Sequence, residues 1–345
     1  MGTTENRRVI VTRRGGPEVL EVVTEGVPEP GPGEIRVKTV AAGVSSYDVM
    51  LRGHWFPGQK LPYTPGEDVV GLVDELGAGV SGLEVGQRVA LWTFGDAGGY
   101  AEYVTQPAER AVAVPADLDA VDAVALVVNY LTASLAMNQT ARVQPGERML
   151  AHGAAGGVGS ALVQLGTRAG LEVYGTASAY NHELVESLGA VPIDYRNDDF
   201  VAKIRDLTGD GVDVVFDVIG GGRQLWRSSR ALRKGGRLVM LGMASAVKGG
   251  IKTVPGSMLV VGLVEVLPNG KTAPTGPGMD SYPEAHMGWY RDSLAEFFDL
   301  AVTGKMKPVI AKRVPLAEAA KAHELLERGG HAGKVVLTTD AYNNA

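Results

Sequence analysis

The chain has 345 residues, enough for about two domains, and its 45% hydrophobic and 21% charged residues are the balance of a globular protein with cores of its own. A net charge of −6 without a basic stripe argues against a nucleic-acid or membrane-surface partner. The chain has no cysteine, which excludes disulfides, thiolate catalysis, iron–sulfur clusters and cysteine-ligated zinc.

The opening residues, MGTTENRRVIVTRR, lack the apolar core of a signal peptide. The apolar runs in the rest of the chain fall well short of the roughly 20 residues of a membrane-spanning helix. We therefore expect a cytoplasmic protein without a membrane span.

The first third of the chain predicts β-strands. Its β-branched or alternating runs are separated by glycine and proline clusters, and they read RRVIVT, EIRVKTVAAGV, VVGLVDEL, QRVALW and GYAEYVT. These runs indicate an antiparallel, partly closed β domain that ends near ERAVAVPADLD.

The spacing of the apolar residues changes from Ala120 onward. DAVDAVALVVNYLTASLAMNQTA has helical spacing, and short apolar strands then alternate with helices. The predicted strands read RMLAHG, LEVYGTA, VPIDY, VDVVFDVIGG, GRLVMLG and MLVVGLV. Strict β–α alternation predicts an α/β domain with a doubly wound parallel sheet.

The last part of the chain begins with a polar stretch rich in glycine and proline, Asn269 to Trp289. Such a stretch is typical of a lid over a substrate or of an ordinary surface loop, and both interpretations stay open. The helices RDSLAEFFDLAVTG and LAEAAKAHELLERGG and the strand KVVLTT follow it. We divide the chain into residues 1–124, the first part of the catalytic domain, residues 125–267, the dinucleotide-binding domain, and residues 268–345, which return to the catalytic domain.

A glycine-rich loop, GAAGGVGS, lies between a predicted strand and a predicted helix. Ala154, Gly156 and Gly159 fit the dinucleotide pattern G-x-G-x-x-G with alanine first, which is tolerable if its φ stays negative. In this pattern Gly156 leaves room for pyrophosphate at the start of the helix, and Gly159 lets the helix lie against the sheet. The loop predicts a dinucleotide site.

The end of the second strand of this domain bears on which dinucleotide is bound. An NAD site usually has a carboxylate there for the ribose 2′-hydroxyl, and YGTASAYN contains none. Ser178 can donate to a 2′-phosphate, so we expect NADPH, with NADH the less favoured cofactor. No lysine or arginine lies in the stretch, so the expected preference is modest.

Across nearly the whole chain, these motifs together resemble the medium-chain dehydrogenase/reductase superfamily. The resemblance is carried by VPEPGPGEIRVKT, PYTPGEDVVGLVDELGAGV, GQRVA and GAAGGVGSALVQL, and within the superfamily it points to the quinone oxidoreductase (zeta-crystallin-like) branch. LVVNYLTAS, GTASAYNHELV and PIDYRNDDFV further resemble its vesicle amine transport protein-like members. The resemblance implies a Rossmann domain joined to a GroES-like catalytic domain, and a homodimer paired through MLVVGLV.

The zinc-dependent members of that superfamily hold a catalytic zinc with cysteines and the histidine of a Gly-His-Glu motif. This chain has Glu67 and Asp68 in place of that histidine and glutamate, and no cysteine. The short link WTFGDAGGYAEY also leaves no room for the lobe with the structural zinc. The resemblance to the zinc-free branch therefore implies that no metal is held.

The resemblance also implies which individual residues form the cofactor site. Ser45 stands where the family has an asparagine near the nicotinamide, and Asn181 stands where many members have a lysine on the 2′-phosphate. The other positions implied are Thr132, Ala155, Gly156, Gly157, Val158, Gly159, Ser178, Tyr195, Ile219, Gly242, Met243 and Lys334.

The implied reaction is the transfer of a hydride from NADPH to a quinone or an α,β-unsaturated carbonyl compound. Tyr47, Tyr130 and Thr132 are candidate proton donors, although a packing role suits both tyrosines at least as well. An apolar substrate pocket lined by Trp55, Phe56 and Trp92 competes with ordinary core packing of the same residues.

Two other functions remain open. One is an enoyl-thioester reductase of the polyketide type, which shares the glycine loop. The other is a protein that binds NADPH without turning it over. This function stays open because Ser45 departs from the family's asparagine, and because Met50 stands where several bacterial quinone reductases have a tyrosine.

Overall fold

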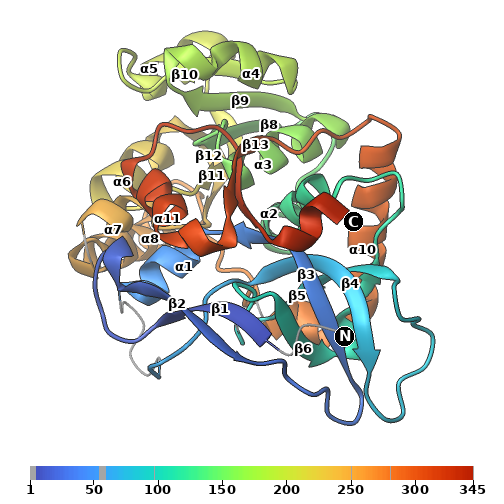
Figure 1. Cartoon of the computed structure of the whole chain (residues 1–345). Helices are drawn as coiled ribbons and strands as arrows, with labels where there is room; N and C mark the ends of the chain where they lie inside the picture. The colour runs from blue at the N-terminus through green and yellow to red at the C-terminus, as the bar shows by residue number, and fades with distance from the viewer. Residues whose placement is uncertain (1–4, 54–59, 97, 250, 280, 345) are drawn as a thin grey trace. The chain divides into compact units, whose positions relative to one another are not determined.

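The structure is a computed structural model that describes residues 5–53, 60–96, 98–249, 251–279 and 281–344. It divides the chain into two compact units, and Figure 1 shows the elements of both. Unit 1 comprises Met1–Leu131, Met279–Gly329 and Lys334–Ala345, and unit 2 comprises Thr132–Gly278 and Gly330–Gly333.

Unit 1 is built on β-sheets. Its larger sheet has the order β13-β14-β3-β4-β5-β7, with β6 paired to β3, and β1 and β2 form a separate antiparallel pair. Within the larger sheet only β13 and β14 pair in parallel. The strands are β1 (Glu5–Val11), β2 (Leu20–Gly26), β3 (Glu34–Val44), β4 (Asp68–Leu76), β5 (Arg88–Trp92), β6 (Tyr103–Pro107), β7 (Val112–Ala113), β13 (Ile310–Pro315) and β14 (Lys334–Thr338).

The helices of unit 1 come from both ends of the chain. They are α1 (Ser46–Arg52), most of α2 (Ala120–Leu135), α9 (Ser281–Ala285), α10 (Met287–Val302) and α11 (Ala319–Arg328). Two apolar clusters fill this unit: one includes Val37, Val69 and Leu91 of the sheet, and the other lies where Val335 and Leu337 of β14 meet Ala322 of α11.

Unit 2 contains a five-stranded parallel sheet of order β10-β9-β8-β11-β12 with helices between successive strands. The strands are β8 (Arg148–His152), β9 (Glu172–Ala177), β10 (Val191–Asp194), β11 (Val212–Asp217) and β12 (Leu232–Met240). The helices are α3 (Gly157–Arg168), α4 (His182–Ser187), α5 (Phe200–Thr208), α6 (Gly222–Ala231), α7 (Ala244–Gly249) and α8 (Val254–Val266). The predicted doubly wound sheet is confirmed.

The segment MLVVGLV is not the strand that the sequence predicts. It lies inside helix α8, which begins with Pro255 in its first turn and leaves Leu259 and Leu263 exposed. A short apolar run fits a buried strand and a helix equally well by periodicity alone, and proline is well suited to a helix start. Beyond β12 the sheet is extended by Thr272, which forms a parallel bridge with Arg237. Edge-to-edge pairing through MLVVGLV is therefore wrong.

One apolar helical stretch is longer than the sequence analysis expected of any apolar run. In the described part of the chain, residues Ala120–Ala141 are long and apolar enough to cross a membrane by length and composition, with a mean hydropathy of 1.6. The expectation that every apolar run is too short for a span was wrong for this stretch. Within the protein, however, 89% of its apolar window is buried, as in a core helix.

Candidate cofactor site

The glycine-rich loop joins the end of β8 to the start of α3 in unit 2. Gly156 is the N-cap of α3 in an extended conformation, and glycine has no side chain to cap the helix. The amides of the first turn have no partner inside the helix, and the helix dipole adds positive potential at the same point. The loop thus presents backbone donors to an anion, and this geometry fits a dinucleotide pyrophosphate.

Two glycines of the loop have roles that their backbone explains. Gly153 has the positive φ of a tight turn, +66°, and Ala154 is not among the residues with a positive φ, so alanine is tolerated there. A Cβ on Gly159 would lie 2.0 Å from the carbonyl oxygen of Gly153, so only glycine lets α3 approach the strand end. The segment Gly330–Gly333 lies beside the loop, where the amide of Gly333 donates to the carbonyl of Ala155 at 2.8 Å.

The ends of β9 and β10 bring an unpredicted cation to the position that we expect to bear on cofactor choice. Ser178 is buried at the end of β9, while Tyr195 directly follows β10 and is half-exposed. The guanidinium of Arg196 lies over the rings of Tyr180 and Tyr195, 5.8 and 5.7 Å from their centroids. Asn181 is partly buried close by, as the N-cap residue of α4.

The ends of β11 and β12 bring together three further predicted positions. The amide of Ile219 donates to the Asp217 carboxylate at 2.9 Å, and Ser245 donates its amide to the Ile219 carbonyl at 2.7 Å. A Cβ on Gly242 would lie 2.8 Å from the carbonyl of Val218. Ile219, Gly242 and Met243 therefore share the edge of the sheet that also carries the glycine loop.

His152, at the end of β8, is a buried structural residue. Its ring nitrogens lie 3.0 Å from the hydroxyls of Thr176 and Ser228, and Ser228 donates to Asp217 at 2.7 Å. Burial lowers the pKa of His152. The histidine holds neighbouring strand ends together and is not accessible for proton transfer.

In unit 1, Ser45 is held by a buried carboxylate. Ser45 is the N-cap of α1 and forms a reciprocal capping box with Asp48. Asp48 accepts the amide and the hydroxyl of Ser45, both at 2.8 Å, together with the amide of Gly66 at 2.9 Å and the hydroxyl of Tyr100 at 3.2 Å. Burial raises the pKa of Asp48, and the bonds from Ser45 and Gly66 oppose that rise.

A chain of buried polar side chains continues from Asp48 through Tyr100. The Tyr100 oxygen is 3.2 Å from Nε2 of His323, and Nδ1 of His323 is 3.1 Å from the guanidinium of Arg52. Arginine has donors only, so Nδ1 accepts and Nε2 carries the proton that Tyr100 receives. Arg52 also pairs with Glu327. The hydrogen bonds from Arg52 through His323 and Tyr100 all run toward Asp48, which stabilises its anion.

Lys334 begins β14, beside the strand that leads to Ser45. Its amine pairs with Asp68 at 2.8 Å, and both side chains are almost fully buried, at 2% and 1% exposure. Among the described residues, Oδ1 of Asp68 has no hydrogen-bond partner. Glu67, at the position of the zinc-binding histidine, is also buried, and its carboxylate is 3.5 Å from the Ser45 hydroxyl.

The remaining predicted residues are mostly buried. Tyr130 is 1% exposed and packs against Phe297, and Thr132 is 8% exposed. Trp92 is 1% exposed against Phe94. Tyr47 is partly buried on α1. Trp55 and Phe56 lie outside the described residues, and the catalytic and pocket roles of all six stay predictions.

No group of three or more histidine or acidic side chains that could hold a metal ion occurs in the part of the chain that the structure describes.

The sequence analysis missed the role of Arg196 and the chain from Asp48 to Glu327. A signal for Arg196 was present, because it follows Tyr195 at the end of a predicted strand. The chain from Asp48 had no local signal, since His323 lies 223 positions from Tyr100 and 271 positions from Arg52.

Comparison with known proteins places these features among dehydrogenases. Residues 31–116 match the alcohol dehydrogenase GroES-like domain, and residues 188–337 match the zinc-binding dehydrogenase family.

Three curated relatives match nearly the whole chain. The quinone oxidoreductase of Rattus norvegicus is 32% identical over 96% of this chain and 97% of its own length. The 2-haloacrylate reductase of a Burkholderia species is 32% identical over 96% of this chain and 98% of its own. The synaptic vesicle membrane protein VAT-1 homolog of Homo sapiens is 31% identical over 96% of this chain and 86% of its own.

Among solved structures, the quinone oxidoreductase of Escherichia coli, crystallised with NADPH, aligns with a TM-score of 0.83. It is 29% identical, and the alignment covers 96% of this chain and 99% of that one.

Proposed function

The chain belongs to the medium-chain dehydrogenase/reductase family, in the branch of the quinone oxidoreductases and VAT-1 homologues, and on this basis we propose that it is an NADPH-dependent reductase of quinones or α,β-unsaturated carbonyl compounds. The observation that carries the proposal is the start of α3, where the N-cap is Gly156 and no side chain caps the helix. The catalysed reduction would be zinc-independent, because the chain lacks the cysteines of a family zinc site. We also expect a homodimer and a cytoplasmic location.

The residues of unit 2 would hold NADPH by its phosphates. The pyrophosphate would lie at the first turn of α3, at Gly157 and Val158, and the 2′-phosphate would lie at the strand ends that carry Ser178 and Arg196. When bound, the cofactor supplies a hydride.

The residues of unit 1 would orient the reacting groups. Asp48 fixes the Ser45 hydroxyl, because that hydroxyl donates to the Asp48 carboxylate and accepts the Asp48 amide, which leaves one lone pair to accept a further hydrogen bond. Tyr47 is the most exposed of the three predicted donor hydroxyls, so we place proton delivery there. Replacing Tyr47 by phenylalanine should lower kcat while the Kd for NADPH stays the same; an unchanged kcat would remove Tyr47 from the reaction.

The deciding experiment measures NADPH oxidation against a panel of quinones, enones and enoyl thioesters. Turnover of quinones or enones supports the proposal. Turnover confined to enoyl thioesters favours the polyketide-type reductase, and tight NADPH binding without any turnover favours a non-catalytic binding protein.

A variant of the loop tests the cofactor site directly. Gly156→Val should abolish NADPH binding, because even the first carbon of the side chain would lie 3.3 Å from the Gly153 carbonyl and the rest would cover the helix start. Gly262→Val, at an open position on α8, is the matched control. Normal NADPH binding by Gly156→Val would disprove the loop assignment.

A further inference from the structure

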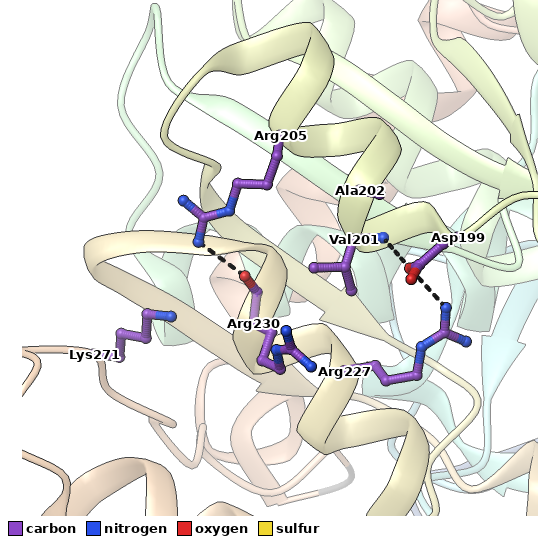
Figure 2. A pocket seen from close by; sticks show the side chains of 7 residues that line it. All are labelled: Asp199, Val201, Ala202, Arg205, Arg227, Arg230 and Lys271. Carbon is purple, nitrogen blue, oxygen red and sulfur yellow. Dashed lines mark hydrogen bonds and ion pairs between the residues drawn. The ribbon is translucent and has the colours of Figure 1, made fainter.

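A cavity of about 370 Å³ lies on unit 2 in the groove between α5 and α6. Figure 2 shows its lining: Arg205 comes from α5, Arg227 and Arg230 come from α6, and Lys271 comes from the segment after α8. Asp199, Val201 and Ala202 complete the wall. A cavity of this size is typical of a site for a small ligand.

The charge of this cavity is opposite to that of the whole protein. It is lined by four cationic side chains and one carboxylate, although the chain as a whole carries a net charge of −6. The carboxylate, Asp199, forms an ion pair with Arg227 at 2.9 Å. Within the described residues, no carboxylate forms an ion pair with Arg205, Arg230 or Lys271.

Backbone carbonyls account for the position of two of these cations. Arg205 donates to the carbonyls of Arg230 and Leu232 at 2.9 and 3.1 Å, and Lys271 donates to the carbonyl of Ser229 at 2.7 Å. These contacts close the last turn of α6. A helix C-terminus carries only about −0.5 of a charge, so the ends of two helices cannot neutralise three full positive charges.

Repulsion among these cations affects the amine of Lys271. Burial and the charges of Arg205 and Arg230 lower its pKa. An anion among the three side chains would relieve this repulsion and would receive charge-assisted hydrogen bonds from two kinds of donor.

We propose that this cavity binds a small phosphate-bearing ligand, either inorganic phosphate or a phosphate monoester. Arg230 offers a guanidinium with no recorded side-chain partner among the described residues, and guanidinium geometry suits phosphate oxygens. Val201 and Ala202 form an apolar wall for the organic part of an ester. A compact hollow of this volume fits a single phosphate group better than an extended nucleic acid.

Arg205 and Arg230 lie away from the proposed dinucleotide site, although Asp199, Val201 and Ala202 line the cavity from the start of α5, on the side of Arg196. In a βαβ unit the helix runs back antiparallel to the strands, so the C-terminal ends of α5 and α6 lie at the amino-terminal edge of the sheet. Arg205 and Arg230 are in the last turns of these helices. The glycine loop follows the carboxyl end of β8, at the opposite edge.

Calorimetric titration of the full chain with inorganic phosphate and with glucose 6-phosphate, at constant ionic strength in a phosphate-free buffer, tests the proposal. We expect Arg230→Gln to weaken binding about tenfold, because the variant loses a charge-assisted hydrogen bond to the phosphate. Arg223→Gln removes an exposed charge from the same helix, outside the cavity, and should leave the Kd unchanged. Tighter binding of glucose 6-phosphate than of phosphate would identify a monoester as the ligand, and equal binding would identify phosphate itself.

Amine labelling of the unmodified protein gives a second readout that needs no variant. Phosphate should protect Lys271 from acetylation several-fold more than it protects the exposed Lys234. No binding of either probe to the unmodified protein, equal Kd values for Arg230→Gln and the unmodified protein, or equal protection of the two lysines would overturn the proposal.

Discussion

We expect the side chain of Arg196 to contribute to the choice between NADPH and NADH. The strand-end stretch Tyr174 to Asn181 contains no cation of its own, yet the fold brings Arg196 from the end of the neighbouring strand onto Tyr180. The phenol rings restrict the guanidinium near the position where a 2′-phosphate would lie, which reduces the entropy lost when the contact forms.

Replacing Arg196 by glutamine should therefore weaken NADPH binding about fivefold, the equivalent of the roughly 1 kcal/mol expected of an exposed ion pair. The Kd for NADH should not change, because NADH has no 2′-phosphate. Titration of both cofactors by fluorescence measures this, with Arg168→Gln at the exposed end of α3 as the control. Equal weakening of both cofactors would contradict the assignment.

His323 makes the stability of the protein depend on pH. Burial, with a smaller contribution from the charge of Arg52, lowers its pKa to about 3, whereas an unfolded histidine titrates near 6.5. Below about pH 6.5 the histidine binds a proton in the unfolded state but not in the folded state. The contribution of neutral His323 to stability is therefore lost progressively as the pH falls toward 3.

Urea unfolding between pH 7.5 and 5 measures this dependence. His323→Asn should be less stable at pH 7.5 but should lose less stability on acidification, with the rest of the slope due to His152, whose pKa is also lowered. His286→Asn changes an exposed histidine and should leave the slope of the unmodified protein unchanged. The same slope in His323→Asn would show that the neutral buried state does not control the dependence.

At the scale of elements, α3 and α8 show opposite requirements for glycine. A methyl group at Gly159 would meet the Gly153 carbonyl at 2.0 Å, whereas one at Gly262 would meet no atom within 4 Å. Gly159→Ala should destabilise unit 2 by about 1–3 kcal/mol through overpacking. Gly262→Ala should stabilise it by about 0.5–1 kcal/mol, because alanine is the better helix former. Urea midpoints of the two variants should move in opposite directions, and a shift in the same direction would refute the packing argument.

The same two helices show when a local sequence pattern is sufficient to predict a helix and when it is not. Helix α3 could be predicted because a strand, a glycine loop and a periodic segment occur in that order within one βα unit. Helix α8 could not, since MLVVGLV has the composition of either element. It is a helix even though several of its apolar side chains are exposed.

At the scale of the whole molecule, the absence of cysteine has a direct consequence for metal content. Elemental analysis of dialysed protein should find zinc near zero, and treatment with a chelator should leave NADPH binding unchanged. One zinc per chain after dialysis would mean that ligands other than cysteine, such as Glu67, form a site. Light scattering of the same sample measures the expected dimer mass.

The sequence by itself determined the features that depend on residues close together in the chain. These are the alternation of strands and helices in unit 2, the position of the glycine loop, and the lack of thiol ligands, because periodicity and turn chemistry are local properties. The tertiary structure alone decided the rest: Arg196 over Tyr180, the polar chain from Asp48 through His323, the Lys334–Asp68 pair and the cationic cavity between α5 and α6. Each of these joins side chains from different elements, and only the packing of those elements determines which charges become neighbours and which are removed from water.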